Sequence, residues 1–124
     1  MPAGPALVTS AFATSQRRAD SRKAGYVLHQ LGEYERAVEA YRASIADRPT
    51  AEAHTFLGWS LSYLGRIDEA IAECKIAIRL DPDFGNPYND IGVYLLDRGQ
   101  LEDAVPWLEK AIASKRYCCY QFHG

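Results

Sequence analysis

The first candidates for covalent or acid–base chemistry are three histidines and three cysteines. Catalysis by either type needs a neighbouring base and an orienting carboxylate within hydrogen-bond reach. His29, His54 and His123 are widely separated, and no serine or cysteine has an evident base with an orienting carboxylate. We therefore expect no enzyme activity, and we expect His54 to be a packing residue.

The cysteines are Cys74, Cys118 and Cys119, an odd number that does not make a disulfide framework. Adjacent cysteines could bond to each other only through a strained ring. Together with His123 the adjacent pair offers ligands to a soft metal, but it lacks the C-x-x-C spacing of structural zinc sites. The sequence therefore predicts a reducing compartment, a buried Cys74 that behaves as a small hydrophobe, and no metal site.

One acidic segment has part of the pattern of an ion-binding loop. Asp81, Asp83 and Asn86 resemble the first ligands of a calcium loop. Gly92 stands where such a loop has its bidentate glutamate, so we interpret the segment as a turn between helices. No glycine-rich phosphate motif is present in the sequence, and we expect no cofactor.

Aromatic side chains are stronger candidates for function, because they give a large contact area at low entropic cost. Phe56, Trp59 and Tyr63 recur at helical spacing. They form a stripe rotated by roughly 100° from the packing stripe of the same segment. The packing stripe consists of His54, Leu57, Gly58, Leu61 and Leu64. Two interpretations remain open: the aromatic stripe binds a partner, or Phe56 and Tyr63 pack against neighbouring helices.

These aromatic residues belong to a segment, residues 51–84, that recurs imperfectly once before and once after itself. Equivalent glycines and alanines are 33 and then 34 residues apart. The matching sets are Gly25, Gly58 and Gly92; Gly32, Gly65 and Gly99; and Ala37, Ala70 and Ala104. A period of this length is typical of helical hairpins that bury their apolar faces only by stacking on neighbours.

The three copies resemble tetratricopeptide repeats (TPR). The family pattern has a large residue, Leu-Gly and an aromatic in the first helix, then Ala, an aromatic and Pro in and after the second. In the middle copy these places hold His54, Leu57, Gly58, Leu61, Ala70, Cys74 and Pro82. The resemblance implies an all-α fold, a right-handed α-solenoid of antiparallel helix pairs, with repeats at 18–50, 51–84 and 85–118. The third copy departs from the pattern, because Arg116 replaces the proline.

Several local signals place the helices. The first copy is predicted to form helices at 18–31 and 34–47, separated by a turn at Gly32. Asn86 is expected to be an N-cap that precedes a proline at the first helical position. Pro106 falls early in the last helix and is expected to bend that helix without breaking it.

The two ends of the chain differ from the repeats. Residues 1–17 are rich in Pro, Ala, Ser and Thr, so we expect a flexible tail. This segment lacks the charged start of a signal peptide, and we expect none. Residues 119–124 are expected to be a tail or the start of a truncated fourth repeat or capping helix. The aromatic end from Tyr117 to Phe122 is a candidate surface for homo-oligomer formation.

In TPR proteins the first helices of successive repeats line a concave groove that binds peptides. The resemblance therefore places the aromatic stripe, together with the equivalent residues of the other copies, on such a groove. It would be basic at one end, aromatic in the middle, and acidic or amide at the other. Its residues would be Arg22, Lys23, Tyr26, His29, Thr55, Phe56, Trp59, Tyr63, Asn89, Asp90, Val93 and Asp97.

Some TPR proteins hold the acidic C-terminal tails of the Hsp70 and Hsp90 chaperones in a clamp of lysine, asparagine and arginine side chains. The matching positions here hold Arg22, Tyr26, Phe56, Asn86 and Asp90. Only Arg22 keeps the positive charge, and Asp90 would repel a carboxylate. The clamp is therefore not expected in this chain.

Length, composition and charge limit the remaining function classes. A chain of 124 residues is expected to form a single domain. The net charge of -2 argues against nucleic-acid and membrane-surface binding, since both favour a cationic face. We expect a cytoplasmic, co-chaperone-like adaptor or scaffold for a protein or peptide ligand. The alternatives are the TPR portion of a larger enzyme or of a secretion or assembly system, and a self-associating assembly module.

Overall fold

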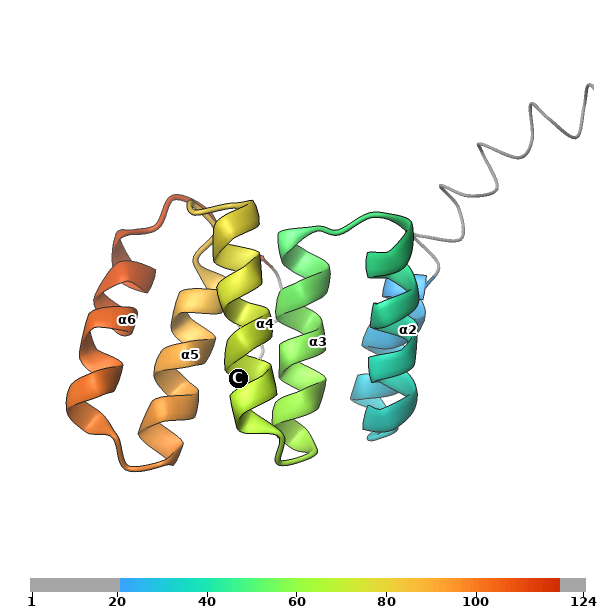
Figure 1. Ribbon diagram of the computed structural model, residues 1–124, viewed down its shortest axis with the longest axis horizontal. Coiled ribbons are helices and arrows are strands. Elements are labelled where there is room, and N and C mark those ends of the chain that lie inside the picture. The colour runs from blue at the N-terminus through green and yellow to red at the C-terminus, as the bar shows by residue number, and fades with distance from the viewer. Residues whose placement is uncertain (1–20, 119–124) are drawn as a thin grey trace, which may run out of the picture.

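The computed structural model describes residues 21–118 of the chain. Residues 21–30 are helical, followed by α2 (Tyr34–Asp47), α3 (Ala51–Tyr63), α4 (Ile67–Leu80), α5 (Asn86–Asp97) and α6 (Leu101–Ala113). The helices stand side by side in one row of antiparallel pairs (Figure 1). Apart from one isolated bridge, between Phe84 and Arg116, the described residues contain no β-structure. The predicted all-α solenoid of helix pairs is confirmed.

Most local predictions agree with these bounds. The helix predicted at 34–47 is confirmed, and residues 21–30 are the described part of the helix predicted at 18–31. Pro106 lies inside α6, which continues to Ala113, so the predicted absence of a break is confirmed. The tails predicted at 1–17 and 119–124 lie outside the described residues.

A glycine with positive φ ends the first helix of each hairpin. The φ angles of Gly32, Gly65 and Gly99 are 81°, 80° and 77°, in a region that other residue types rarely adopt. After α3, the N–H of Arg66 donates to the carbonyl of Leu61 at 3.0 Å, which is the six-to-one bond of a Schellman motif. The glycine thus lets the chain reverse within the three residues between α3 and α4, and it sets α4 antiparallel to α3.

A second set of glycines brings the two helices of each hairpin close together. A Cβ atom built on Gly25 would lie 2.6 Å from the ring of Tyr41, and one on Gly58 would lie 3.0 Å from the carbonyl oxygen of Ala70. On Gly92 the same atom would collide with the side chain of Leu108. In each hairpin the missing side chain of a glycine in the first helix therefore leaves the space in which a residue of the second helix packs.

The middle of the row is the best-buried part of the structure. α3 buries residues around most of its circumference, since it packs on α2, α4 and α5. Leu57 and Leu61 are the largest apolar side chains that α3 buries almost completely. α3 can therefore hold a side chain such as Phe56 in a fixed position.

A cluster of aromatic rings joins the first repeat to the second. The ring of His29 stacks on Trp59 at 3.6 Å between centroids, and Tyr34 and Tyr63 meet the same imidazole edge-on at 5.0 and 4.8 Å. His29 Nδ1 lies 2.9 Å from the hydroxyl oxygen of Ser60. Burial lowers the pKa of His29 from 6.5 to about 4, so this imidazole is neutral at physiological pH.

One local prediction, the N-cap at Asn86, is wrong. Gly85 is the N-cap of α5, Asn86 is the first helical residue, and Pro87 follows it. The side chain of Asn86 forms no cap, because it bonds to the main chain of Cys118. A long-range contact has thus replaced the local one that the sequence favours.

The close contact at Gly25 yields a stability prediction. Gly25→Ala adds a methyl group against the fully buried ring of Tyr41 and should lower the free energy of unfolding by about 1–3 kcal/mol, despite the better helix propensity of alanine. Gln30→Ala, on an exposed position of the same helix, should change it by less than about 0.5 kcal/mol. Urea titration monitored by circular dichroism measures both values. Equal stability of the two variants would contradict the packing argument.

The buried imidazole of His29 yields a pH prediction. The unfolded chain takes up the proton near pH 6.5 and the folded chain near pH 4, so stability present at neutral pH is lost as the pH falls through this interval. Between about pH 7.5 and about pH 5, the wild type should lose on the order of 2 kcal/mol more than His29→Gln. Urea titrations at a series of pH values test this difference. Parallel curves for the two proteins would contradict it.

Candidate functional site

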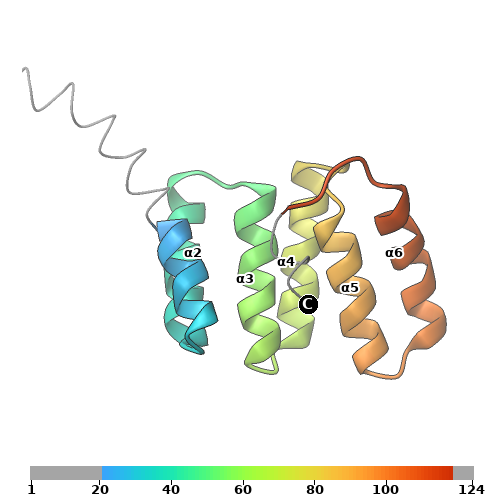
Figure 2. The same cartoon turned by 180° about the vertical axis from the view of Figure 1, so that it is seen from behind.

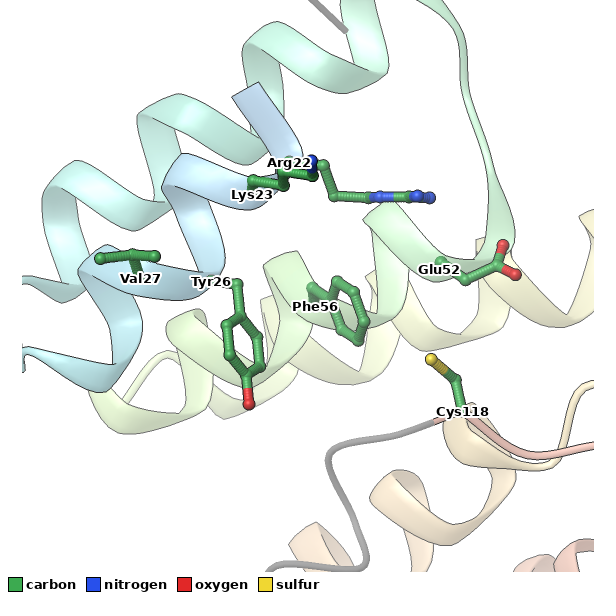
Figure 3. Close-up of a pocket in the computed structure, with 7 residues that line it drawn as sticks. All are labelled: Arg22, Lys23, Tyr26, Val27, Glu52, Phe56 and Cys118. Atoms are coloured by element: carbon green, nitrogen blue, oxygen red, sulfur yellow. The ribbon is translucent and has the colours of Figure 1, made fainter. Parts of the chain in front are cut away.

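A pocket of about 550 Å³ opens between the helix of residues 21–30, which we call the N-terminal helix, α3 and the segment that follows α6 (Figure 3). We call it the aromatic pocket. Its lining residues are Arg22, Lys23, Tyr26, Val27, Glu52, Phe56 and Cys118. The first four lie on the N-terminal helix, the next two lie on α3, and Cys118 comes from the far end of the array. Three separate parts of the chain therefore build one site.

Two aromatic rings form the apolar part of this pocket. The rings of Tyr26 and Phe56 are 6.5 Å apart between centroids. Behind Phe56 lies the buried ring of Tyr41, at 5.9 Å, and Tyr26 also contacts Trp59 at 6.3 Å. Because a second layer of rings supports the first, the aromatic surface is held in place before any ligand arrives.

The rim of the aromatic pocket carries charges of both signs. Arg22 and Lys23 are exposed on the N-terminal helix, and the long side chain of Arg22 extends toward the α3 side (Figure 3). Glu52 stands on that side, where its carboxylate pairs with Arg116 at 3.1 Å. Since Arg116 offsets the charge of Glu52, the rim as a whole favours anionic groups.

Residues 114–118, which we call the strap, bring Cys118 to the pocket. After α6 the chain turns back across the ends of the helices and reaches the neighbourhood of α3 (Figure 2). The Asn86 side chain holds the end of the strap: its Nδ2 donates to the Cys118 carbonyl at 2.8 Å, and its Oδ1 accepts from the Cys118 N–H at 2.9 Å. The strap thus closes one side of the pocket.

The cysteines differ from one another in state. Cys74 is a free, fully buried thiol, as predicted, and burial raises its pKa. Cys118 is disulfide-bonded. Within residues 21–118 no group of three metal-binding side chains occurs. The same part of the chain has no helix that is long and apolar enough to cross a membrane.

Four of the predicted site residues meet in the aromatic pocket: Arg22, Lys23, Tyr26 and Phe56. Thr55 is fully buried and its hydroxyl donates to the carbonyl of Ala51, so it cannot contact a ligand. His29 is also buried, and it belongs with Trp59 and Tyr63 to the cluster between the repeats.

The predicted site residues on α5 lie outside the pocket. Asp90 is buried, Asn89 is half-buried, and Val93 and Asp97 are exposed. The aromatic pocket lies between the first and second repeats, one helix away from them. A groove that continues from the aromatic pocket onto these α5 residues stays a prediction.

Three lining residues escaped prediction: Val27, Glu52 and Cys118. Val27 lies four residues after Lys23, and Glu52 lies four residues before Phe56, so helical spacing already put each on the face of a predicted residue. For Cys118 no local signal existed, because its place depends on a contact with Asn86 across 32 residues.

Comparison with known proteins agrees with this architecture. A sequence model of the tetratricopeptide repeat matches residues 22–83 and, again, 57–117. The chain is 30% identical over 97 residues, 77% of its length, to the TPR repeat-containing thioredoxin TTL4 of Arabidopsis thaliana. It is 31% identical over 81 residues, 64% of its length, to the small glutamine-rich tetratricopeptide repeat-containing protein 2 of Mycosarcoma maydis. The chain spans only 14% and 23% of the lengths of these two relatives.

Solved structures show the same arrangement of helices. The TPR2B domain of yeast Sti1, in its complex with pHsp70, superposes with a TM-score of 0.74 at 26% identity, over 77% of this chain and 78% of that one. MamA superposes with a TM-score of 0.72 at 26% identity, over 77% of this chain and 57% of that one. The repeat period, the glycine turns, the row of helix pairs and these matches agree, and the chain belongs to the tetratricopeptide repeat family.

Proposed function

We propose that this protein is a non-catalytic adaptor that binds a peptide segment of a partner protein in the aromatic pocket. The observation that carries the proposal is the pair of supported rings, Tyr26 and Phe56, beside the exposed Arg22 and Lys23. An apolar site with a few well-placed polar groups is the usual form of a ligand pocket, and its volume of about 550 Å³ lies in the usual range.

The chemistry of the aromatic pocket indicates the kind of segment that fits. An apolar or aromatic anchor would cover the partly exposed ring of Tyr26 and the small exposed part of Phe56, which is 7% exposed, and would remove this apolar surface from water. An acidic residue beside the anchor would meet Arg22 and Lys23 on the rim. The preferred ligand is therefore a short peptide that combines an apolar anchor with a neighbouring carboxylate.

The comparisons support peptide binding in general terms. The TPR2B domain of Sti1 was solved in complex with pHsp70, at 26% identity to this chain. At the clamp positions named above, however, this chain has Tyr26 and Phe56 as part of an apolar surface, and Asp90 is buried. We therefore propose a ligand defined by its anchor and not by a pair of terminal carboxylates.

A second candidate function follows from the size of the relatives. The match to the TPR repeat-containing thioredoxin covers 14% of that protein, so the repeat unit there is one part of a larger protein. Under this alternative the same pocket would recruit a target to an activity carried elsewhere. Self-association through the aromatic end from Tyr117 to Phe122 also stays a prediction, since most of that segment lies outside the described residues.

Two exposed valines give a matched test of the pocket. Val27 lines the aromatic pocket and is 54% exposed, whereas Val93 is 39% exposed on α5 and lies outside it. The ligand is the tightest-binding peptide selected from a random display library. Val27→Asp places a carboxylate against the apolar anchor of this peptide and should lower the binding affinity by at least about tenfold. Val93→Asp should leave the affinity within about twofold. Isothermal titration calorimetry measures both. Equal affinities would exclude the pocket as the binding site.

The rim charges give a second test. The double variant Arg22→Glu with Lys23→Glu should lose binding of selected peptides that carry an acidic residue, because the attraction becomes repulsion. Arg36→Glu with Arg42→Glu, on exposed positions of α2, makes the same change in net charge and should retain binding. Fluorescence anisotropy at low and high salt measures the effect, and wild-type affinity should fall as salt rises. Loss in both double variants would indicate a net-charge effect and not a local one.

A further inference from the structure

The strap lies against the start of α5 as an extended segment. The main-chain N–H of Gly85 donates to the Arg116 carbonyl at 2.8 Å, and the Arg116 N–H donates to the Asp83 carbonyl at 3.2 Å. Phe84 and Arg116 thereby form a parallel β-bridge. These contacts are made to main-chain atoms, so they would accept an extended peptide of many sequences.

The Asn86 side chain extends this recognition to the next part of the strap. Its amide satisfies both the N–H and the carbonyl of Cys118, at 2.9 and 2.8 Å. Asn86 is 1% exposed, and a buried side-chain amide needs hydrogen-bond partners. The main chain of Cys118 supplies them. A side-chain amide that bonds both polar groups of one residue acts on the main chain as a neighbouring β-strand would, and it places no demand on the side chain at that position.

The strap is pressed against α5 and is also held by side-chain bonds, in part to exposed groups. A Cβ atom on Gly85 would collide with the hydroxyl of Ser114 and with the ring of Tyr117. Arg116 pairs with Asp81 and Glu52, and its guanidinium lies 4.4 Å from the ring centroid of Phe84. The Arg116 side chain is 42% exposed, and ion pairs of this exposure contribute little to stability. A peptide that supplies equivalent bonds to Asn86 and to the main chain at Asp83 and Gly85 could therefore take the place of the strap.

We propose that the strap is an internal ligand of the peptide site, and that a partner peptide displaces it and pairs its own main chain with the Asn86 amide. This inference rests on the proposed function, because the same peptide fills the aromatic pocket beside Cys118 with its anchor. The partner is an extended segment, whose backbone Asn86 binds and whose anchor the rings bind. The tethered strap competes at an effective concentration on the order of millimolar, which lowers the affinity of weak ligands.

Two substitutions at one position separate the strap from the site. Cys118→Pro removes the N–H that donates to Asn86 Oδ1, and the proline ring takes the place of that hydrogen. Cys118→Ser keeps the N–H, and both substitutions remove the disulfide of Cys118. A difference between the two variants therefore reports how the main chain of the strap at position 118 is seated against Asn86.

The probe is a synthetic peptide with the strap sequence and serine in place of cysteine, SKRYS, titrated into each ¹⁵N-labelled variant and followed by NMR. Cys118→Pro should bind the probe at least about tenfold more tightly than Cys118→Ser, because its internal competitor is weakened. The side-chain amide signals of Asn86 should shift in Cys118→Pro and return toward the Cys118→Ser positions as the probe saturates. Affinities within about twofold, or Asn86 signals that ignore the probe, would overturn the proposal.

Gly85→Ala provides a second route that leaves both Asn86 and position 118 unchanged. The backbone of Gly85 is in the right-handed helical region, so alanine fits the main chain, and its methyl group displaces the strap. This variant should shift the side-chain amide signals of Asn86 as Cys118→Pro does, but the probe should not restore them, because its serine and tyrosine would meet the same methyl group as Ser114 and Tyr117. Asn86 signals that are the same in this variant and in the wild type would contradict the seating of the strap at Gly85 and Asn86, whether or not Cys118→Pro folds.

The outcomes distinguish this inference from the proposed function. If library peptides bind Cys118→Pro and Cys118→Ser equally, and Val27→Asp weakens both, the pocket binds peptides and the competition by the strap is wrong. If no library peptide binds either variant, yet the probe prefers Cys118→Pro, the proposed function fails while the strap site at Asn86 stands.

Discussion

The close contact of two helices at a glycine is the constraint on which the rest of this structure depends. At Gly25, Gly58 and Gly92 the first helix of a hairpin has no side chain, and a residue of the second helix fills that space. A larger residue there would separate the pair and expose the alanines that line the contact. Because the three contacts recur with one period, the hairpins stack with their first helices on one side of the row.

That stacking explains why the aromatic pocket is rigid. Tyr26 and Phe56 come from the first helices of adjacent repeats, and their backbones are fixed by the same glycine contacts. The buried ring of Tyr41 supports Phe56 from behind, so the residue that occupies the space at Gly25 also supports the pocket. Packing and binding surfaces therefore share residues, and the cost of preorganising the pocket is met when the chain folds.

The strap adds a feature that the repeat architecture does not require. Asn86 belongs to the third repeat, yet its side chain bonds the residue that reaches the pocket between the first two. Arg116, which stands where the earlier copies have proline, forms the ion pairs that accompany this contact. The departure of the third copy from the family pattern thus has a structural use.

The sequence alone determined the helices and their turns, because these follow from local rules. The period of the glycines, the positive-φ turns at Gly32 and Gly65, and four of the pocket residues could all be predicted from spacing along the chain. Contacts between distant residues could not. Which ring Trp59 stacks on, and whether Asn86 capped α5 or held Cys118, depended on what the stacked repeats brought within a few ångströms. Tertiary structure decided these points because a side chain bonds whichever partner lies nearest in space, and local propensity is weaker than a buried long-range contact.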